Sequence, residues 1–180
     1  DYLENDWTDG ENFLELPVQV TKPEGSAEDL AYVKDLLGSF TTSFSTSSAD
    51  RSKNVNSGAK HVNGTVLYPG ETFSMYETVA PFTAENGYAM AGSYLNGEVV
   101  DSMGGGICQV STTLYNAVLR AELEVVERSP HSMTVHYVEL SEDAAIAGTY
   151  KDFKFKNSTE YPIYIEGYTT SDKKITFNIY

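Results

Sequence analysis

The sequence predicts an α+β fold in which a helix that carries the only cysteine packs on an antiparallel sheet. A run of three glycines, residues 104–106, leads directly into a helical spacing of apolar residues that begins near Cys108. After residue 123 the chain becomes a series of short β-type segments separated by turn residues. Thirteen tyrosines, with threonines and valines in the C-terminal half, also favour β structure.

The composition excludes several classes of protein. A length of 180 residues, with 41% apolar and 12% aromatic residues, suits a globular chain with one sizeable core, alone or with an appendage. The formal net charge of −14 argues against a nucleic-acid partner, because such binding depends on Lys and Arg. One cysteine excludes an intrachain disulfide, and no stretch approaches the ~18 apolar residues of a membrane span. The start at Asp1, without a visible signal peptide, makes us expect an excised fragment whose targeting segment was removed.

The first part of the chain divides near residue 38. Residues 13–20 have a loose strand pattern, and Ser26 is positioned to cap a helix that ends at Gly38. Its apolar face would contain Leu30, Val33, Leu36 and Leu37. We expect residues 1–38 to be the tail of a preceding module or an N-terminal extension, and residues 39–180 to form the main domain. Within that domain, residues 39–49 are predicted to be extended and residues 51–62 to form a short helix.

The central part of the chain alternates turn signals with short strands. Asn63-Gly64 and Pro69-Gly70 enclose a short strand at residues 65–67, and Asn96-Gly97 predicts a hairpin within residues 88–100. A helix is predicted over residues 108–122. Its core face would contain Ile107, Val110, Leu114, Ala117, Val118 and Ala121, and a second stripe would contain Cys108, Thr112 and Tyr115.

The C-terminal part reads as an antiparallel meander. Strands are predicted at residues 123–127, 133–140, 153–156, 163–168 and 174–180, with turn residues between the later ones.

Cys108 is the first candidate for chemistry. The N-terminus of a helix offers unpaired N–H groups and a positive dipole, which favour an anion and therefore the nucleophilic thiolate. The glycines before it would let a substrate backbone approach closely. We assign Gly105, Gly106, Gln109 and Ser111 around the thiol as oxyanion or substrate-binding residues. The alternative for a lone cysteine is a small buried apolar side chain.

A cysteine nucleophile needs a base, and the chain has three histidines. His131 and His136 differ by five positions, so a regular strand would point them to opposite faces. We favour His131, because it follows Pro130 at the mouth of the predicted strand, where functional sites commonly lie. His61 lies far upstream beside a turn and ranks last.

An acidic residue should orient the imidazole, and two are available. We choose Asp152 over Asp143, because Asp152 has the opposite parity to Phe153 and would face away from the core that Phe153 enters. The order of helix with cysteine, strand with histidine and strand with aspartate resembles that of the papain and transglutaminase-like superfamily, an analogy at the level of the fold.

Other ligand classes have weaker signals. Arg128 and Arg120 are candidates for binding a substrate carboxylate; a solvated or ion-paired arginine is the favoured interpretation for Arg120 and an equal alternative for Arg128. The chain has no His-Glu-x-x-His motif, and a single cysteine with two histidines on opposite strand faces cannot close a tetrahedral metal site. The glycine run is not followed by Gly-Lys-Ser/Thr, so it is not a phosphate loop. We expect no metal and no cofactor.

Several motifs together resemble the VanW family. They are residues 63–74 (NGTVLYPGETFS), residues 104–115 (GGGICQVSTTLY), residues 127–132 (ERSPHS), residues 143–146 (DAAI) and residues 151–157 (KDFKFKN), and they span about residues 40–165 in order. The chain departs from the family pattern at residues 139–143, ELSED, where Pro-x-Gly-Arg-Asp is more usual.

The resemblance implies work on the bacterial cell wall. Some VanW domains are reported as L,D-transpeptidases that cross-link peptidoglycan through the cysteine that matches Cys108. It also implies peptidoglycan stem peptides as partners, a location outside the bacterial membrane, and a membrane anchor beyond these residues. Two alternatives stay open: a cysteine peptidase or amidase that uses water in place of the acceptor amine, and a non-catalytic domain that binds the wall and keeps the thiol as a core residue.

Overall fold

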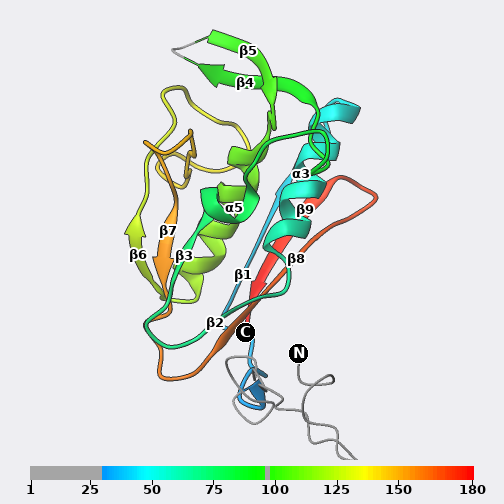
Figure 1. Ribbon diagram of the computed structural model, residues 1–180. Helices are drawn as coiled ribbons and strands as arrows, with labels where there is room; N and C mark the ends of the chain where they lie inside the picture. Colours follow the sequence, from blue (N-terminus) through cyan, green and yellow to red (C-terminus); the bar gives the residue numbers. More distant parts are fainter. Residues whose placement is uncertain (1–29, 96–97) are drawn as a thin grey trace, which may run out of the picture.

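The computed structural model describes residues 30–95 and 98–180, which form a mixed α+β fold (Figure 1). Its elements, in chain order, are β1 (Gly38–Ser43), α3 (Ala49–Val62), β2 (Thr65–Leu67), β3 (Thr72–Ser74), α4 (Met75–Val79), β4 (Met90–Leu95), β5 (Glu98–Met103), α5 (Ile107–Arg120), β6 (Glu124–Glu127), β7 (Lys154–Lys156), β8 (Ile163–Thr169) and β9 (Lys174–Ile179). All strand pairs within the described residues are antiparallel.

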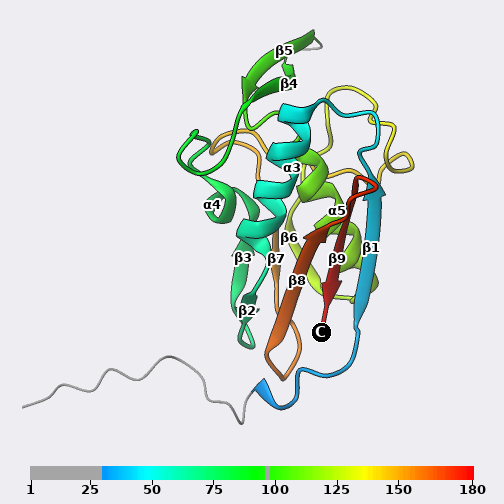
Figure 2. The same ribbon diagram turned by 90° about the vertical axis from the view of Figure 1, so that its right-hand side faces the viewer.

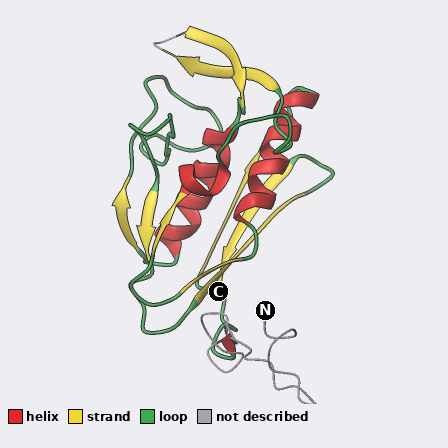
Figure 3. Ribbon diagram, in the orientation of Figure 1, coloured by secondary structure: helices red, strands yellow, loops and turns green. Residues whose placement is uncertain are grey.

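A four-stranded sheet in the order β1-β9-β8-β2 supports both long helices (Figure 3). Alternate residues of β9 are buried beneath the helices: Ile175, Phe177 and Ile179 are each 0% exposed. Helix α5 is fixed to β1 by a hydrogen bond of 2.8 Å between the hydroxyls of Thr42 and Thr113. Helices α3 and α5 touch at Gly58, where an added Cβ would lie 2.8 Å from Ile107. These contacts fix the position of α5 against β1 and α3.

The second sheet, β3-β7-β6, packs against α5 through aromatic side chains. Tyr115 of α5 meets the Phe153 ring edge-on at 5.4 Å, and the Phe155 ring lies 5.1 Å from that of Phe73. Helix α5 is therefore enclosed by two sheets and α3, and its core residues Val110, Leu114, Ala117 and Val118 are all 0% exposed. Buried residues of both sheets and both long helices form one continuous cluster.

The β4–β5 hairpin extends past the ends of α3 and α5 (Figures 1 and 2). Asn54 of α3, which is 0% exposed, holds both of its roots. The amide nitrogen donates to the carbonyl oxygens of Ala89 and Gly105 at 3.0 and 2.9 Å, and the amide oxygen accepts from the Ala89 N–H at 2.7 Å. The base of the hairpin, at Ala89, and the glycine run, at Gly105, are thus fixed by the same side chain.

Most of the predicted elements are confirmed. The segments at 39–49, 51–62, 65–67, 108–122, 123–127, 153–156, 163–168 and 174–180 each contain the expected helix or strand, with ends shifted by a few residues. The helix predicted after Ser26 does not continue to Gly38 as expected: Leu30 is helical, but residues 31–34 form turns and Leu36 is exposed. The strand at residues 13–20, the Ser26 cap and the turn at residues 96–97 lie outside the described residues.

Two expectations about the C-terminal part are wrong. Residues 133–140 form no strand, although their alternation suits one, because no neighbouring strand supplies the hydrogen bonds that a strand needs. The later strands are also not one meander: β7 pairs with β3 and β6, whereas β8 and β9 pair with each other in the other sheet. The papain-like order is not confirmed, since His131, Asp143 and Asp152 all lie outside helices and strands. No helix among the described residues is long and apolar enough to cross a membrane.

Candidate active site

The glycine run turns the chain from β5 into α5. Gly104 and Gly106 have φ of 80° and 105°, a backbone region that suits glycine. An added Cβ on Gly105 would lie 2.2 Å from the carbonyl oxygen of Ala91, so β4 itself requires glycine there. The Gly105 N–H donates to the Ser102 carbonyl at 3.3 Å, which leaves it unsuited to the oxyanion role expected from the sequence. Within the described residues, the Gly106 and Cys108 N–H groups make no backbone hydrogen bond.

Cys108 lies in the first turn of α5 and is half-buried. Its thiol donates a hydrogen bond to the carbonyl oxygen of Ile146 at 3.4 Å. Burial raises the pKa of the Cys108 thiol, and the nearby charges of Arg51 and Lys151 act against this rise. The resting thiol is therefore protonated near neutral pH. The helix terminus does not by itself produce the thiolate that the sequence position suggested.

One stripe of α5 holds an extended segment, residues 142–146, along the helix. The Asn116 amide donates to the carbonyl of Glu142 at 2.7 Å. One turn earlier, the Thr112 hydroxyl accepts from the Ala144 N–H at 3.0 Å and approaches its carbonyl at 3.3 Å. The thiol of Cys108 completes the series at Ile146. Residues 142, 144 and 146 thus face the helix, as alternation in an extended chain requires.

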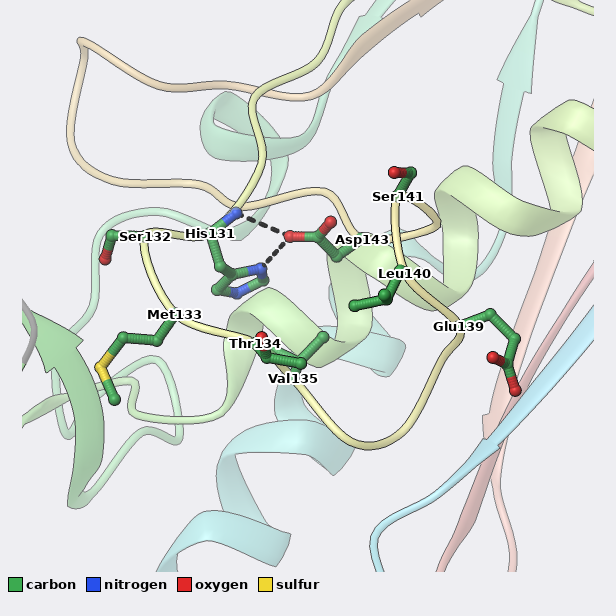
Figure 4. Close-up of a pocket in the computed structure, with 9 residues that line it drawn as sticks. All are labelled: His131, Ser132, Met133, Thr134, Val135, Glu139, Leu140, Ser141 and Asp143. Atoms are coloured by element: carbon green, nitrogen blue, oxygen red, sulfur yellow. Dashed lines mark hydrogen bonds and ion pairs between the residues drawn. The ribbon is translucent and has the colours of Figure 1, made fainter.

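Asp143 points away from the helix and meets the loop that carries His131 (Figure 4). Its Oδ2 accepts from both the imidazole Nδ1 and the backbone N–H of His131, each at 2.6 Å. Its Oδ1 forms an ion pair of 2.9 Å with Arg128. Partial burial raises the pKa of Asp143, but the two His131 hydrogen bonds and the Arg128 charge outweigh it, so the pKa is lowered overall.

This geometry fixes the tautomer of His131. An ionised carboxylate only accepts hydrogen bonds, so Nδ1 of the neutral ring must carry the proton and Nε2 must be the basic nitrogen. The His131 side chain is 6% exposed, whereas His136 is exposed to solvent. The structure thus places His131 beside a carboxylate, as the sequence led us to expect. The strand parity used to choose it does not apply, because no strand exists there.

A cavity of about 210 Å³ opens beside the imidazole (Figure 4). It is lined by His131, Ser132, Met133, Thr134, Val135, Glu139, Leu140, Ser141 and Asp143. The loop of residues 131–143 therefore carries the histidine, its carboxylate partner and the walls of the cavity. No hydrogen bond joins His131 to Cys108 in the described part of the chain; the 142–146 segment contacts His131 through Asp143 and Cys108 through Ile146.

Asp152 is not the partner of His131, so the positional expectation for it was wrong. Its Oδ2 accepts from the Ser74 hydroxyl at 2.6 Å, and its Oδ1 accepts from the Tyr76 and Phe153 N–H groups, each at 2.8 Å. Ser74 caps α4, so Asp152 ties the start of that short helix to the approach of β7. The parity argument does not apply at this position, because residues 152 and 153 precede β7 and Asp152 is buried like Phe153.

Most of the other assigned site residues are buried or bonded within the protein. The Gln109 amide, on a side chain that is 1% exposed, donates to the Thr42 hydroxyl and the Ser43 carbonyl at 3.0 and 2.9 Å, so it anchors α5 to β1. Ser111 is 0% exposed, and its hydroxyl has no partner among the described residues. Arg128 binds Asp143 and the Ser141 carbonyl, and it lies 5.6 Å above the Tyr115 ring. Only Gly106 keeps a position suited to contacting a substrate.

Three residues near the thiol could not be identified from a sequence pattern. Arg51 lies in the first turn of α3, and Lys151 follows a small turn closed by a bridge between Ala147 and Lys151. Both act electrostatically on Cys108. Tyr137 is half-buried. Burial raises the pKa of its hydroxyl, and a negative charge on Cys108 would raise that pKa further. None has a fixed spacing from Cys108, so only the folded chain brings them together.

Chemically, the arrangement offers a thiol at a helix N-terminus and a histidine prepared as a base by an ionised aspartate. No group of three or more potential metal ligands is clustered anywhere in residues 30–95 and 98–180.

The comparisons with known proteins agree on one family. The family model described as "VanW like protein" matches residues 50–180. The uncharacterized protein YoaR of Bacillus subtilis is 39% identical over 157 residues, 87% of this chain and 52% of that protein. The vancomycin B-type resistance protein VanW of Enterococcus faecalis is 31% identical over 134 residues, 71% of this chain and 48% of that protein. The chain thus spans about half the length of the curated relatives it matches. No solved structure matches it significantly.

Proposed function

Because this chain belongs to the VanW family, we propose that it acts on the bacterial cell wall as a cysteine-dependent L,D-transpeptidase. One matching relative bears the name of a vancomycin resistance protein, which agrees with work on peptidoglycan. The substrates would be peptidoglycan stem peptides, and the site of action would be the outer side of the bacterial membrane. A membrane anchor would belong to a part of the protein beyond these residues.

The observation that carries the proposal is the hydrogen-bonded pair of His131 and Asp143. A buried imidazole with its Nδ1 bonded to an ionised carboxylate at 2.6 Å is a prepared general base. The same short segment that supplies Asp143 also contacts the Cys108 thiol through Ile146. Nucleophile and base are thus held by one piece of backbone, which supports a shared role.

The proposed reaction begins when a donor stem peptide displaces the Ile146 contact from the thiol. Nε2 of His131 takes the thiol proton, and the sulfur attacks the carbonyl carbon that precedes the terminal D-amino acid. The N–H groups of Gly106 and Cys108 receive the negative oxygen. The C–N bond then breaks, and the terminal amino acid leaves with the proton held by His131. A thioester on Cys108 remains.

An acceptor amine completes the reaction. Its nitrogen attacks the thioester carbon, the C–S bond breaks, and the amine proton passes through His131 to the sulfur. The cross-link is an amide, and the thiol is restored. Water in place of the amine would give a carboxypeptidase or amidase with the same residues. The pair need not be in contact without substrate, because catalytic hydrogen bonds often shorten only in the complex.

The test is incubation with a disaccharide-tetrapeptide, followed by mass spectrometry of the products and of the protein. Transpeptidation gives a cross-linked dimer and free D-amino acid, and hydrolysis gives only the shortened monomer. The Cys108→Ala variant should give neither product and no acyl adduct. Unchanged substrate with a folded, unmodified wild-type protein would contradict the catalytic proposal.

A non-catalytic wall-binding domain is the second candidate, and one observation favours it. The thiol bonds to a backbone carbonyl, and burial raises its pKa, as expected for a packed cysteine. This candidate expects the Cys108→Ala variant to bind peptidoglycan sacculi as well as the wild-type protein does. The transpeptidase proposal expects binding to survive as well, but dimer formation to be lost.

A further inference from the structure

Two cations converge on the only cysteine of an acidic chain. The sequence has 12 Lys and Arg against 26 Asp and Glu, so basic residues are scarce. The charges of Arg51, in α3, and Lys151, at the end of the 147–151 turn, nevertheless both act to lower the pKa of the Cys108 thiol against the effect of burial. The family resemblance assigns neither residue a role, and the proposed mechanism uses neither.

Arg51 is held against the turn that precedes the thiol. A Cβ on Gly106 would lie 2.9 Å from its Cγ, 3.3 Å from its Nε and 3.5 Å from its Cζ, so the Arg51 side chain packs against the Gly106 turn with its stem nearest and its guanidinium close by. Its Nη1 donates to the Ser47 hydroxyl at 2.6 Å, and its own N–H is capped by Ser48 at 3.2 Å. The side chain is half-buried. These contacts orient the arginine toward the N-terminus of α5.

Lys151 supplies the second charge from the loop side. Its ammonium donates to the Pro130 carbonyl at 3.3 Å, next to the loop that carries His131. The Lys151 charge, like that of Arg51, acts to lower the pKa of the Cys108 thiol, and the dipole of α5 acts in the same sense. A protein with a net charge of −14 would otherwise repel an anionic ligand.

We propose that Arg51 makes the Cys108 site selective for electrophiles that carry a carboxylate close to the reacting carbon. The inference rests on the proposed function for its natural ligand, which is the free carboxylate of the terminal residue that leaves the donor peptide. That carboxylate lies a few bonds from the carbon that the sulfur attacks. A guanidinium binds it through paired hydrogen bonds, a geometry that a lysine ammonium does not reproduce. Lys151 contributes charge without this geometry.

The first experiment measures selectivity without any peptide substrate. Iodoacetate and iodoacetamide alkylate Cys108 by the same step, in which the S–C bond forms, the C–I bond breaks and iodide leaves. They differ in charge. The ratio of the iodoacetate rate to the iodoacetamide rate should be higher for the folded protein than for a short cysteine peptide. The Arg51→Gln variant should lower that ratio by about tenfold, as expected for the loss of hydrogen bonds to a charged group.

Two further variants make this result specific. Arg51→Lys keeps the charge and should keep only part of the ratio. Arg120→Gln makes the same charge change at the far end of α5, where Arg120 bonds to Asn116, and should leave the ratio as in the wild-type protein. Circular dichroism and a melting curve verify folding; if Arg51→Gln does not fold, Arg51→Lys carries the test. Equal slowing of both reagents in the Arg51 variants would mean that Arg51 acts only on thiol ionisation, and would overturn the inference.

The second experiment separates this inference from the proposed function. Donor peptides with a free or an amidated C-terminus are compared for KM and kcat. Arg51→Gln should raise KM for the free acid about tenfold and leave that for the amide unchanged. If no protein turns over any peptide, but the alkylation ratio falls as expected, the transpeptidase function fails and the carboxylate selectivity stands. If the wild-type protein makes dimers and the ratio does not depend on Arg51, the function stands and the selectivity fails.

Discussion

Asp143 accepts hydrogen bonds from three side-chain or backbone donors, two of them from His131 and one from Arg128. Its two oxygens receive the imidazole and backbone N–H of His131 and the guanidinium of Arg128. Arg128 also binds the Asp143 carbonyl at 2.6 Å, so backbone and side chain are fixed together. One carboxylate therefore sets the position of the base, its tautomer and the shape of the adjoining cavity.

Replacing Asp143 and Asp152 by asparagine should give opposite phenotypes. Asp143→Asn removes the acceptor that fixes the Nδ1–H tautomer, so kcat for stem peptides should fall by about 10²- to 10⁴-fold. Asp152→Asn disturbs the buried bonds to Ser74 and Tyr76, so it should lower the free energy of unfolding by about 1–3 kcal/mol while the folded fraction keeps its kcat. Urea unfolding and product analysis on both variants test this pair. A larger kcat loss in Asp152→Asn would refute the assignment of Asp143.

The alkylation rate of Cys108 and the free energy of unfolding should both reflect the raised pKa of the thiol. Burial raises the pKa of Cys108 above its ordinary value of 9.0, so folded protein should react with iodoacetamide more slowly than unfolded protein at pH 8. The unfolded chain releases this proton first as pH rises through 9.0, so the folded state keeps a proton that the unfolded state lacks. Stability should therefore decline above that pH. The difference in unfolding free energy between the wild-type protein and Cys108→Ala isolates the thiol from the tyrosines. A difference that does not vary with pH would contradict the raised pKa.

At the scale of elements, the junction of hairpin, glycine run and α5 determines where the thiol lies. Asn54 joins α3 to both roots of the β4–β5 hairpin, and Gly105 lets the β4 backbone come close. On the other side of α5, the Asn116, Thr112 and Cys108 stripe holds the 142–146 segment. The first turn of α5 is thereby held from both sides before any substrate binds.

A substitution at Gly105, compared with a control substitution at Gly70 in the turn between β2 and β3, tests how tightly this junction is packed. Gly105→Ala would place a methyl group against the Ala91 carbonyl, so the hairpin must shift, at a cost of about 3 kcal/mol or more. Gly70→Ala meets no atom within 4 Å, and only its φ of 85° opposes it, at about 1–2 kcal/mol. Chemical denaturation of both variants gives the comparison. Equal costs would mean that the hairpin root yields easily and does not position α5.

For the whole molecule, α5 is the element through which the two larger sheets share one core. Its apolar face packs against β1 and β9, and Tyr115 reaches Phe153 beside β7. Chain segments from both ends of the domain therefore meet on a single helix. A domain joined in this way should unfold as one unit.

A pair of leucines on α5 tests this cooperativity. Leu114→Ala opens a cavity at a residue with 0% exposure and should cost about 2–5 kcal/mol. Leu119→Ala, at 43% exposure on the same helix, should cost under about 1 kcal/mol. Hydrogen exchange of β7 and β9 should rise together in Leu114→Ala. Faster exchange in one sheet alone would show that the sheets unfold separately.

Much of the fold could be read from local pattern. The apolar spacing of residues 107–118 predicted α5, Asn63-Gly64 marked the turn before β2, and the glycine run placed Cys108 in a first helical turn. These features depend on neighbours within a turn or two, so the amino-acid order alone determines them. The VanW motifs likewise lie in the order itself, and the family match confirms the resemblance.

Partnership between distant residues was decided only by the tertiary structure. Strand parity favoured Asp152 over Asp143, yet the segment that carries Asp143 is fixed through Ala144 by Thr112, which is 32 residues away. Residues 133–140 have a strand pattern but lack a neighbour to pair with, and the carboxylate of Asp152 was taken by Ser74, 78 residues distant. Arg51 reaches Gly106 only because α3 packs on α5. Pattern determines which face a residue presents, whereas packing of whole elements determines what that face meets.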